Sequence, residues 1–388
     1  MDAFILDAVR TPFGRYRGGL SHIRTDDLAA LPIAELVKRL PRLDPARIDD
    51  VMLGDTNGVG EDNRNVGRMA ALLAGLPVTV PGVTINRLCG SGGEAVVQAA
   101  RAVAAGDAGV VVAGGVESMS RAPYVLAKPD EALPTTMELH QTTVGWRMLN
   151  PKFPANWTDS LGVCAERVAA EYGIGREAQD EWALRSHQRA AAAWDAGRHD
   201  DHVLRVEGVH RDESIRPDTS AEALARLRPA FSRDGAVTAG NASPLNDGSI
   251  ALLVGTATVA SELDVEPLGR IVASAVTATE PDRFSVAPVP AIRRALARVG
   301  RRLEDVDVFE INEAFAAMVL SCLHDLPEID PERVNPNGGA IAYGHPLGAS
   351  QPRVVVDLCR ELRRRGGGLG VAAACIGVGL GLAIVCEV

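Results

Sequence analysis

The chain has 388 residues, a net charge of −10 and 46% hydrophobic residues. Its length suggests two or three domain-sized units, and its acidic balance argues against a general nucleic-acid-binding role, because such proteins are usually basic. The sequence predicts no membrane span. The nearest candidate, residues 369–386, contains several glycines and fits a buried pair of strands better.

The first residues, MDAFILDAVRTP, carry an acid at position 2 instead of the basic start of a secretion signal. Six cysteines are present and none forms a C-x-x-C pair. We therefore expect a cytoplasmic protein with free thiols. Because the histidines are scattered along the chain, the sequence predicts no metal site.

The first 117 residues alternate short apolar strands with helical segments. The predicted strands cover residues 2–9, 51–53, 83–86 and 109–113, and the predicted helices cover residues 25–40, 65–75 and 94–105. This βαβαβαβ alternation predicts an α/β fold with a parallel sheet that has helices on both faces.

The segment 118–246 has a different character. It is richer in charged residues, Trp, His and Pro, and contains one amphipathic helix near 176–197. We interpret it as an inserted loop domain that lies over the core.

Strand and helix alternation resumes after about residue 267. The predicted elements are strands at 269–273 and 306–311, helices at 290–299 and 313–323, and a glycine-rich segment at 335–350. The predicted units are an N-terminal half (1–117 plus 247–266), the inserted domain (118–246) and a C-terminal half (267–388).

The second half repeats features of the first at an offset of 258 residues. Gly90 and Val96-Val97 match Gly348 and Val354-Val355. If the halves are duplicates, two equivalent helix N-termini lie near a shared pseudo-twofold axis. The alternative is chance similarity between two ordinary βα units.

Cys89 lies in a glycine-rich turn between a predicted strand and a predicted helix, in the motif NRLCGSG. Unpaired N–H groups and the partial positive charge of a helix N-terminus favour a thiolate and lower the pKa of such a thiol. Cys89 is therefore the candidate nucleophile. The alternative is a buried structural cysteine.

His345 occupies the corresponding turn of the second half, in YGHPLG, where it could accept a proton from a cysteine or donate to an oxyanion. Cys375, in CIGVG, ends a strand at a glycine turn and could move a proton to and from carbon; its alternative role is core packing. Asn312, in NEAFAA, is either a simple helix N-cap or a group that holds a water in an oxyanion site.

Six motifs together resemble the thiolase family, in order and at the family's spacing. They are NRLCGSG, GGVESMSRAPY, TAGNAS with NDG, NEAFAA, NPNGGAIAYGHPLGAS and CIGVG. The resemblance covers essentially the whole chain. It implies the thiolase fold, in which two duplicated βαβαβαββ halves stack helices between two five-stranded sheets and carry an inserted loop domain.

The resemblance also implies catalytic roles. Cys89 attacks the acyl thioester and becomes acylated, while His345 activates it and, with a water held by Asn312, stabilises one oxyanion. Cys375 moves the proton on the carbon of acetyl-CoA. The backbone N–H groups of Cys89 and Gly377 form a second oxyanion hole.

The implied partners are CoA and acyl-CoA or 3-oxoacyl-CoA thioesters. CoA is a substrate, so no cofactor or metal is implied, and thiolases of this type are homodimers or homotetramers. The residues that match CoA contacts in the family are Arg216, Phe231, Ser243, Ala314 and Phe315.

Several family glycines are replaced in this sequence, and one larger residue is replaced by a glycine. The glycine replacements are Pro244, Ser285, Ala287, Gln351 and Val378, and the opposite change is Gly93. A Cβ at position 378 is expected to narrow the acyl site or to force a different backbone angle. These changes bear on substrate identity more than on reaction class.

The segments TTVGWR and DSLG resemble degradative thiolases, including the 3-oxoadipyl-CoA type, which favours thiolytic cleavage, as in fatty-acid oxidation, over synthesis. Two other readings remain. A 3-oxoacyl synthase shares the fold but lacks the second catalytic cysteine, and a catalytically silent acyl-CoA or lipid binder usually loses Cys89 or His345.

Overall fold

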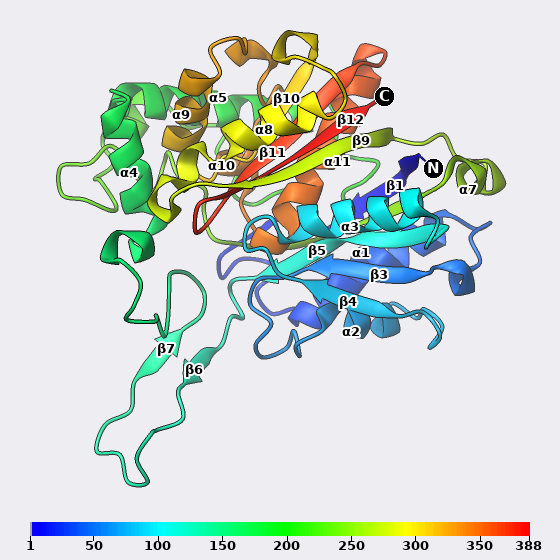
Figure 1. Cartoon of the computed structure of the whole chain (residues 1–388), viewed down its shortest axis with the longest axis horizontal. Helices are drawn as coiled ribbons and strands as arrows, with labels where there is room; N and C mark the ends of the chain where they lie inside the picture. Colours follow the sequence, from blue (N-terminus) through cyan, green and yellow to red (C-terminus); the bar gives the residue numbers. More distant parts are fainter. Residues whose placement is uncertain (1) are drawn as a thin grey trace.

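The computed structural model of the chain describes residues 2–388. The strands are β1 (Ala3–Arg10), β2 (Gly14–Arg15), β3 (Asp50–Gly54), β4 (Gly82–Ile85), β5 (Val110–Ser118), β6 (Tyr124–Leu126), β7 (Leu139–Gln141), β8 (Asn246–Gly255), β9 (Gly269–Ala278), β10 (Val308–Ile311), β11 (Leu369–Ile376) and β12 (Leu380–Glu387). The helices are α1 (Thr25–Arg39), α2 (Val66–Leu73), α3 (Ser91–Ala105), α4 (Leu161–Glu171), α5 (Arg176–Asp195), α6 (Ala221–Ala225), α7 (Ala257–Leu263), α8 (Pro288–Ala297), α9 (Ala316–Asp325), α10 (Ala340–Tyr343) and α11 (Leu347–Arg365). Figure 1 shows their arrangement.

Hydrogen-bonded strands run in the order β10-β11-β12-β9-β1-β8-β5-β3-β4, with β2 beside β8. The outer strands β3, β4 and β5 are mutually parallel, as are β10 and β11. The inner strands β1, β8, β9 and β12 pair antiparallel. The prediction of a parallel sheet is therefore wrong for the middle, because the chain re-enters beside β5 after the insertion and beside β11 through a tight turn.

The two halves of the sheet meet only where Ala3–Ile5 of β1 pairs with 269–271 of β9. The N-terminal half has the five strands that the resemblance implies. The C-terminal half has four, and a single bridge between Phe309 and Val334 stands where a fifth would be. The expectation of five strands in each half is therefore corrected for the second half.

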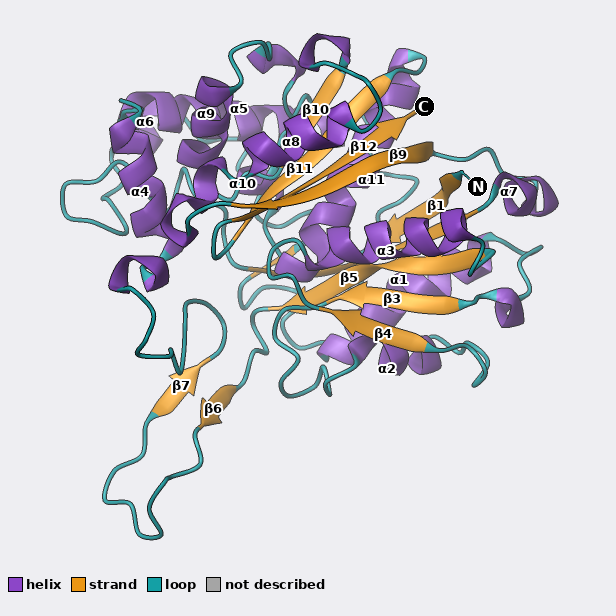
Figure 2. Ribbon diagram, in the orientation of Figure 1, coloured by secondary structure: helices purple, strands orange, loops and turns teal. Residues whose placement is uncertain are grey.

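Helices α3 and α11 lie between the two strand layers and pack on each other (Figure 2). The matched pairs Val96-Val97 and Val354-Val355 lie in one buried cluster. The segments that repeat in the sequence are therefore the two helices at the centre of the molecule.

The outer faces of the two halves carry further helices. Helices α1 and α2 pack on β8 and β3 of the N-terminal half, and α8 packs on β9 and β12 of the C-terminal half. Each half therefore has helices on both faces, and apolar burial on both sides explains the continuous hydrophobic runs in β5 and β8.

The chain between β5 and β8 forms the insertion. Its helix α5 confirms the helix expected near 176–197, and α4 and α5 pack on α9 and α10 of the C-terminal half. The hairpin β6–β7 extends away from the body (Figure 1). No helix within residues 2–388 is long and apolar enough to cross a bilayer. The exact division into three units stays a prediction.

Candidate active site

Cys89 lies in the turn that connects β4 to α3. Leu88 has a φ of 49°, which is unusual for a non-glycine residue, and the turn is held by local side chains. Asn86 Oδ1 accepts the Leu88 N–H at 2.9 Å, and Ser91 Oγ donates to the Leu88 carbonyl at 2.6 Å. These bonds fix the backbone on either side of the thiol.

The Cys89 side chain is 7% exposed. The pKa of its thiol is raised to about 11, chiefly by burial and slightly by Glu117, although hydrogen bonds from the N–H groups of Gly377 and Cys89 act to lower it. The expectation of a lowered pKa is wrong for the ligand-free site, because desolvation outweighs the helix N-terminus. Cys89 is therefore a neutral thiol that must lose its proton during attack.

His345 lies in the short connection between α10 and α11, and its imidazole has a defined tautomer. Its Nδ1 is 2.6 Å from Ser350 Oγ, and that hydroxyl donates its only proton to the Pro346 carbonyl at 2.8 Å. Nδ1 must therefore carry the hydrogen, which leaves Nε2 as a proton acceptor. Burial and Arg353 lower the pKa of His345 to about 4, so the ring is neutral at neutral pH.

The backbone of His345 is held by Asn246, whose Oδ1 accepts the His345 N–H at 2.9 Å. Gly344, with a φ of 107°, precedes it, and a Cβ on Gly344 would lie 2.4 Å from Asn246 Cγ. Only glycine fits where the backbone passes this close to the Asn246 side chain. The N-D-G motif of β8 therefore positions the imidazole.

Asn312 follows the end of β10 and lies beside His345. Its Nδ2 is 3.5 Å from both ring nitrogens, and its Oδ1 is buried without a hydrogen-bond partner. The N-cap of α9 is Phe315, so the interpretation of Asn312 as a simple helix cap is wrong. A buried amide oxygen beside an imidazole suits a water-binding position.

Cys375 lies near the end of β11 and is 1% exposed. Burial, and then the neighbouring Cys89 and Cys322 thiols, raise its pKa well above the usual value, so it is a protonated thiol. The turn that holds Cys89 touches this strand, because a Cβ on Gly90 would lie 2.4 Å from Ile376 Cδ1. The Cys89 turn of the N-terminal half and the Cys375 strand of the C-terminal half thus bring the two thiols close together.

Glu117 in β5 was not singled out from the sequence. Its carboxylate accepts the Gly348 N–H at the start of α11 at 3.0 Å, and the Thr56 hydroxyl at 2.6 Å. It therefore ties the helix that follows His345 to the half that carries Cys89. Its place in the motif GGVESMS was the only sequence signal.

Trp146, in the motif TTVGWR of the insertion, lies against the turn at Gly377. We call this the oxyanion turn, because the Gly377 N–H belongs to the predicted oxyanion hole. Its Cη2 atom is 3.2 Å from where a Cβ on Gly377 would be, and its Nε1 donates to the Asp159 carbonyl at 3.3 Å. The insertion therefore contributes directly to the surroundings of Cys89.

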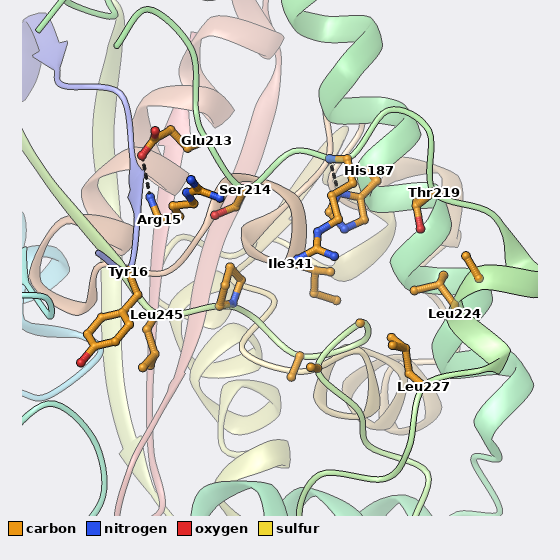
Figure 3. Close-up of a pocket in the computed structure, with 16 residues that line it drawn as sticks. Arg15, Tyr16, His187, Glu213, Ser214, Thr219, Leu224, Leu227, Leu245 and Ile341 are labelled. Carbon is orange, nitrogen blue, oxygen red and sulfur yellow. Dashed lines mark hydrogen bonds between the residues drawn. The ribbon is translucent and has the colours of Figure 1, made fainter. Parts of the chain in front are cut away.

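A cavity of about 640 Å³ is lined mainly by residues of the insertion, together with Arg15, Tyr16 and Ile341 (Figure 3). Its lining residues are Arg15, Tyr16, His187, Glu213, Ser214, Arg216, Thr219, Ala223, Leu224, Leu227, Ala239, Gly240, Ala242, Pro244, Leu245 and Ile341. Figure 3 shows Arg15, Glu213 and Ser214 on one side and Leu224 and Leu227 on the other. Polar and apolar side chains are mixed on both sides, since Leu245 lies on the side of Arg15, and His187 and Thr219 lie on the side of the two leucines.

Arg216 lines this cavity, and its N–H donates to His187 Nδ1 at 3.2 Å. Burial and Arg216 lower the pKa of His187 to about 4. The guanidinium groups of Arg15 and Arg216 have no acidic partner within residues 2–388. Sequence reasoning found Arg216 but missed Arg15, because the two lie 201 positions apart and only the fold brings them to one cavity.

The other residues matched to CoA contacts flank the cavity wall. The Ser243 N–H donates to the Ala314 carbonyl at 3.0 Å, and Ala242 forms a bridge with Phe315. Phe231 packs edge-to-face on Phe315 with ring centroids 5.9 Å apart. The segment that follows Asn312 therefore connects the catalytic cluster to the cavity.

Most of the replaced glycines fit their positions. Pro244 lines the cavity, and neither Ser285 nor Ala287 has a positive φ, so these sites need no glycine. Val378 differs, because it has a φ of 60° in the β11–β12 turn and is 40% exposed. A valine therefore occupies the left-handed region that favours glycine.

One group of possible metal ligands lies away from this cluster, formed by His199, His202 and Asp357. His199 Nδ1 and His202 Nε2 are buried without partners, but so are the Nε donors of the nearby Arg10 and Arg353. A buried water can accept hydrogen bonds from the arginine Nε groups and donate to the imidazole nitrogens, whereas a cation would be repelled by the arginines. These groups therefore match a buried water better than a metal ion.

Two family models match this chain. The description "Thiolase, N-terminal domain" covers residues 3–258, and "Thiolase, C-terminal domain" covers residues 265–388. The chain belongs to the thiolase family. As a thiolase, it is an acyltransferase that acts on CoA thioesters, and the comparisons give no support to the synthase or silent-binder readings.

Curated relatives and solved structures agree with this. A "3-oxoadipyl-CoA/3-oxo-5,6-dehydrosuberyl-CoA thiolase" of Escherichia coli is 50% identical over 100% of this chain and 99% of its own, and a "Beta-ketoadipyl-CoA thiolase" of Acinetobacter baylyi is 48% identical over 99% of both. Human mitochondrial 3-ketoacyl-CoA thiolase in complex with CoA is 36% identical, with a TM-score of 0.92 over 100% of this chain and 98% of that one. The Bacillus anthracis acetyl-CoA acetyltransferase is 40% identical, with a TM-score of 0.91 and the same coverage.

Proposed function

We propose that this thiolase works in the degradative direction and cleaves 3-oxoacyl-CoA thioesters whose acyl chain ends in a carboxylate, as in 3-oxoadipyl-CoA. The observation that carries the proposal is the full-length similarity, at 48–50% identity, to relatives named for that substrate. The motif TTVGWR, which lies on the oxyanion turn through Trp146, supports it.

The first step is acylation of Cys89. His345 Nε2 takes the thiol proton as Sγ attacks the C3 carbonyl, and the backbone N–H groups of Cys89 and Gly377 receive the oxyanion. The raised pKa of Cys89 and the lowered pKa of His345 mean that both groups start neutral. Proton transfer from the thiol to the imidazole is therefore expected to accompany the attack.

Cleavage of the C2–C3 bond then leaves its electron pair on C2 of the departing acetyl-CoA. His345 and a water on Asn312 stabilise this enolate, and Cys375 gives its proton to C2. Acetyl-CoA leaves, and the thiol of a second CoA attacks the acyl-Cys89 thioester and gives its proton to the Cys375 thiolate. The acyl group departs on CoA, and the His345 imidazolium returns its proton to the Cys89 sulfur as the thioester bond breaks.

Arg15 and Arg216 are proposed to bind phosphate groups of CoA in the cavity, with Ser243, Phe231, Ala314 and Phe315 beside its pantetheine arm. CoA is then a substrate, and no metal or organic cofactor is required. Two unpaired guanidinium groups in one cavity support this assignment.

We propose a homodimer or homotetramer in the cytoplasm. Large apolar side chains on and beside the β6–β7 hairpin are exposed, which suits a contact between subunits. They are Tyr124, Leu126, Leu133, Met137 and Leu139. All six cysteines are free, as in a reducing compartment.

The test is CoA-dependent cleavage of 3-oxoacyl-CoA substrates of several lengths, with and without a terminal carboxylate. We expect the dicarboxylic substrate to give the highest kcat/KM, and Cys89→Ala to lose at least about 10³-fold of the activity. Cys359→Ala, a buried cysteine of α11, is the control and should stay active. A higher kcat/KM for uncharged chains would refute the substrate assignment.

A further inference from the structure

Arg147 is a partly buried arginine that follows Trp146 in the insertion. Within residues 2–388 it forms no ion pair, hydrogen bond or ring contact, whereas most arginines on neighbouring segments are engaged. Arg167, for example, pairs with Asp159 at 2.6 Å and with Asp282 at 3.1 Å. A guanidinium without a partner in the protein is available to pair with a charged group of a ligand.

Arg147 directly follows Trp146, the side chain of the insertion that lies at the acyl site. The ring of Trp146 lies on Gly377, whose N–H bonds to the Cys89 thiol. Trp146 is anchored in turn by its bond to the Asp159 carbonyl. Arg147 is thus one residue from a side chain that touches the oxyanion turn.

The electrostatics of the site call for a cation if the substrate carries a carboxylate. Glu117 already acts on Cys89 as a negative group. Arg87, on the same turn as Cys89, is occupied by Glu94 at 3.1 Å. A second negative charge near the thiol therefore needs a positive side chain that is not yet paired.

The chemistry of the reaction sets where that charge lies. Cleavage of a six-carbon 3-oxo dicarboxylic substrate leaves a four-carbon acyl group on Cys89, with its carboxylate about 4 Å from the thioester carbon by standard bond lengths. The carboxylate stays this close through acylation and release. A cation within hydrogen-bond distance of this carboxylate distinguishes such an acyl group from an uncharged one of equal length.

We propose that Arg147 is the specificity-determining residue that binds the terminal carboxylate of a dicarboxylic 3-oxoacyl-CoA, with Trp146 covering the carbon chain between this carboxylate and Cys89. The inference rests on the proposed function and names the recognition element within it. A planar guanidinium matches a carboxylate in two parallel hydrogen bonds, and a neighbouring aromatic ring excludes water from that pair.

The experiment compares 3-oxoadipyl-CoA with 3-oxohexanoyl-CoA, which has the same length and a methyl end, on the wild type, Arg147→Gln and Arg147→Lys. For Arg147→Gln we expect kcat/KM for 3-oxoadipyl-CoA to fall about 10- to 100-fold and that for 3-oxohexanoyl-CoA to stay within about twofold. Arg147→Lys should recover part of the loss, because it restores the charge but not the paired geometry.

Arg205→Gln is the matched control, because Arg205 is exposed, unpaired within residues 2–388 and lines a different cavity. Arg205→Gln should leave kcat/KM unchanged for both substrates. An equal loss on both substrates in Arg147→Gln, or no loss on either, overturns the role of Arg147. A wild type that prefers 3-oxohexanoyl-CoA instead overturns the proposed substrate class, so the two failures are distinguishable.

Discussion

Gly93 of α3 and Gln351 of α11 contact each other, and they occupy equivalent positions in the two halves, 258 residues apart. A Cβ on Gly93 would lie 2.2 Å from Gln351 Oε1 and 2.4 Å from its Cδ. Equivalent residues can touch only where the pseudo-twofold axis passes between them. The two departures from the family pattern are therefore one compensating exchange, in which the glycine in one helix makes room for the side chain in the other.

This pairing predicts non-additive effects on stability. Gly93→Ala alone should destabilise the protein by about 1–3 kcal/mol, because it overpacks a fully buried contact. In a Gln351→Gly background, the same change should stabilise by about 1 kcal/mol through helix propensity. Thermal unfolding of the four proteins in this cycle measures the coupling, and additive effects would show that the residues do not compete for space.

His345 makes the stability of the protein depend on pH. Its folded pKa of about 4 is below the usual value of 6.5, so only the unfolded chain binds the proton between these values. Its contribution to stability is therefore complete above pH 6.5 and is lost as the pH falls towards 4, by roughly 3 kcal/mol.

Comparing melting temperatures of the wild type and His345→Gln at pH 7.5 and 5.0 isolates this effect. The wild type should lose more stability than the variant on acidification. Parallel losses would mean that His345 is not buried as a neutral ring, and that other groups cause the acid sensitivity.

Val378 stores backbone strain in the β11–β12 turn, since a β-branched residue with a φ of 60° is disfavoured by about 1–2 kcal/mol. Val378→Gly should raise the melting temperature slightly, although the greater freedom of glycine in the unfolded chain offsets part of the gain. Val378→Ala is the comparison, because it keeps a Cβ and should gain less. A lower melting temperature for the glycine variant would show that the exposed valine makes stabilising contacts.

Replacing either of the two unpaired arginines that line the cavity is expected to weaken CoA binding. Arg15→Ala and Arg216→Ala should each raise the KM for CoA about 10-fold at low salt and leave kcat almost unchanged, because contacts to phosphate groups that do not react act on binding. Steady-state kinetics at two salt concentrations test this, with Arg301→Ala as an exposed control. A change in kcat without a change in KM would place these residues outside CoA recognition.

The sequence predicted those features that depend on local pattern. The motifs around Cys89, His345 and Cys375 are explained by nearby residues, as are the helix near 176–197 and the helices α3 and α11 that follow Cys89 and His345. The raised pKa of Cys89 was not predictable, because it depends on burial by segments from both halves. The same holds for Arg15, which reaches the cavity of Arg216 only through the fold.

Strand direction was the other failure. The alternation of strands and helices was read correctly, but β8 follows an insertion and β12 follows a turn at Gly377, and neither connection contains a helix that crosses back over the sheet. Strands joined without such a crossover pair antiparallel. The absence of a crossover helix before these strands, which is visible in the sequence, therefore indicates the antiparallel pairing.

The strands on either side of the insertion are direct neighbours, with Ser118 of β5 paired with Asp247 of β8. A segment that leaves and re-enters the sheet at adjacent points can be lengthened, shortened or exchanged without altering the path of either strand. Trp146 lies on this segment, whereas Cys89, His345 and Cys375 do not. Evolution, or a protein engineer, can therefore redesign which acyl chain is accepted by replacing one continuous stretch of the gene, while the bond-breaking chemistry is inherited unchanged.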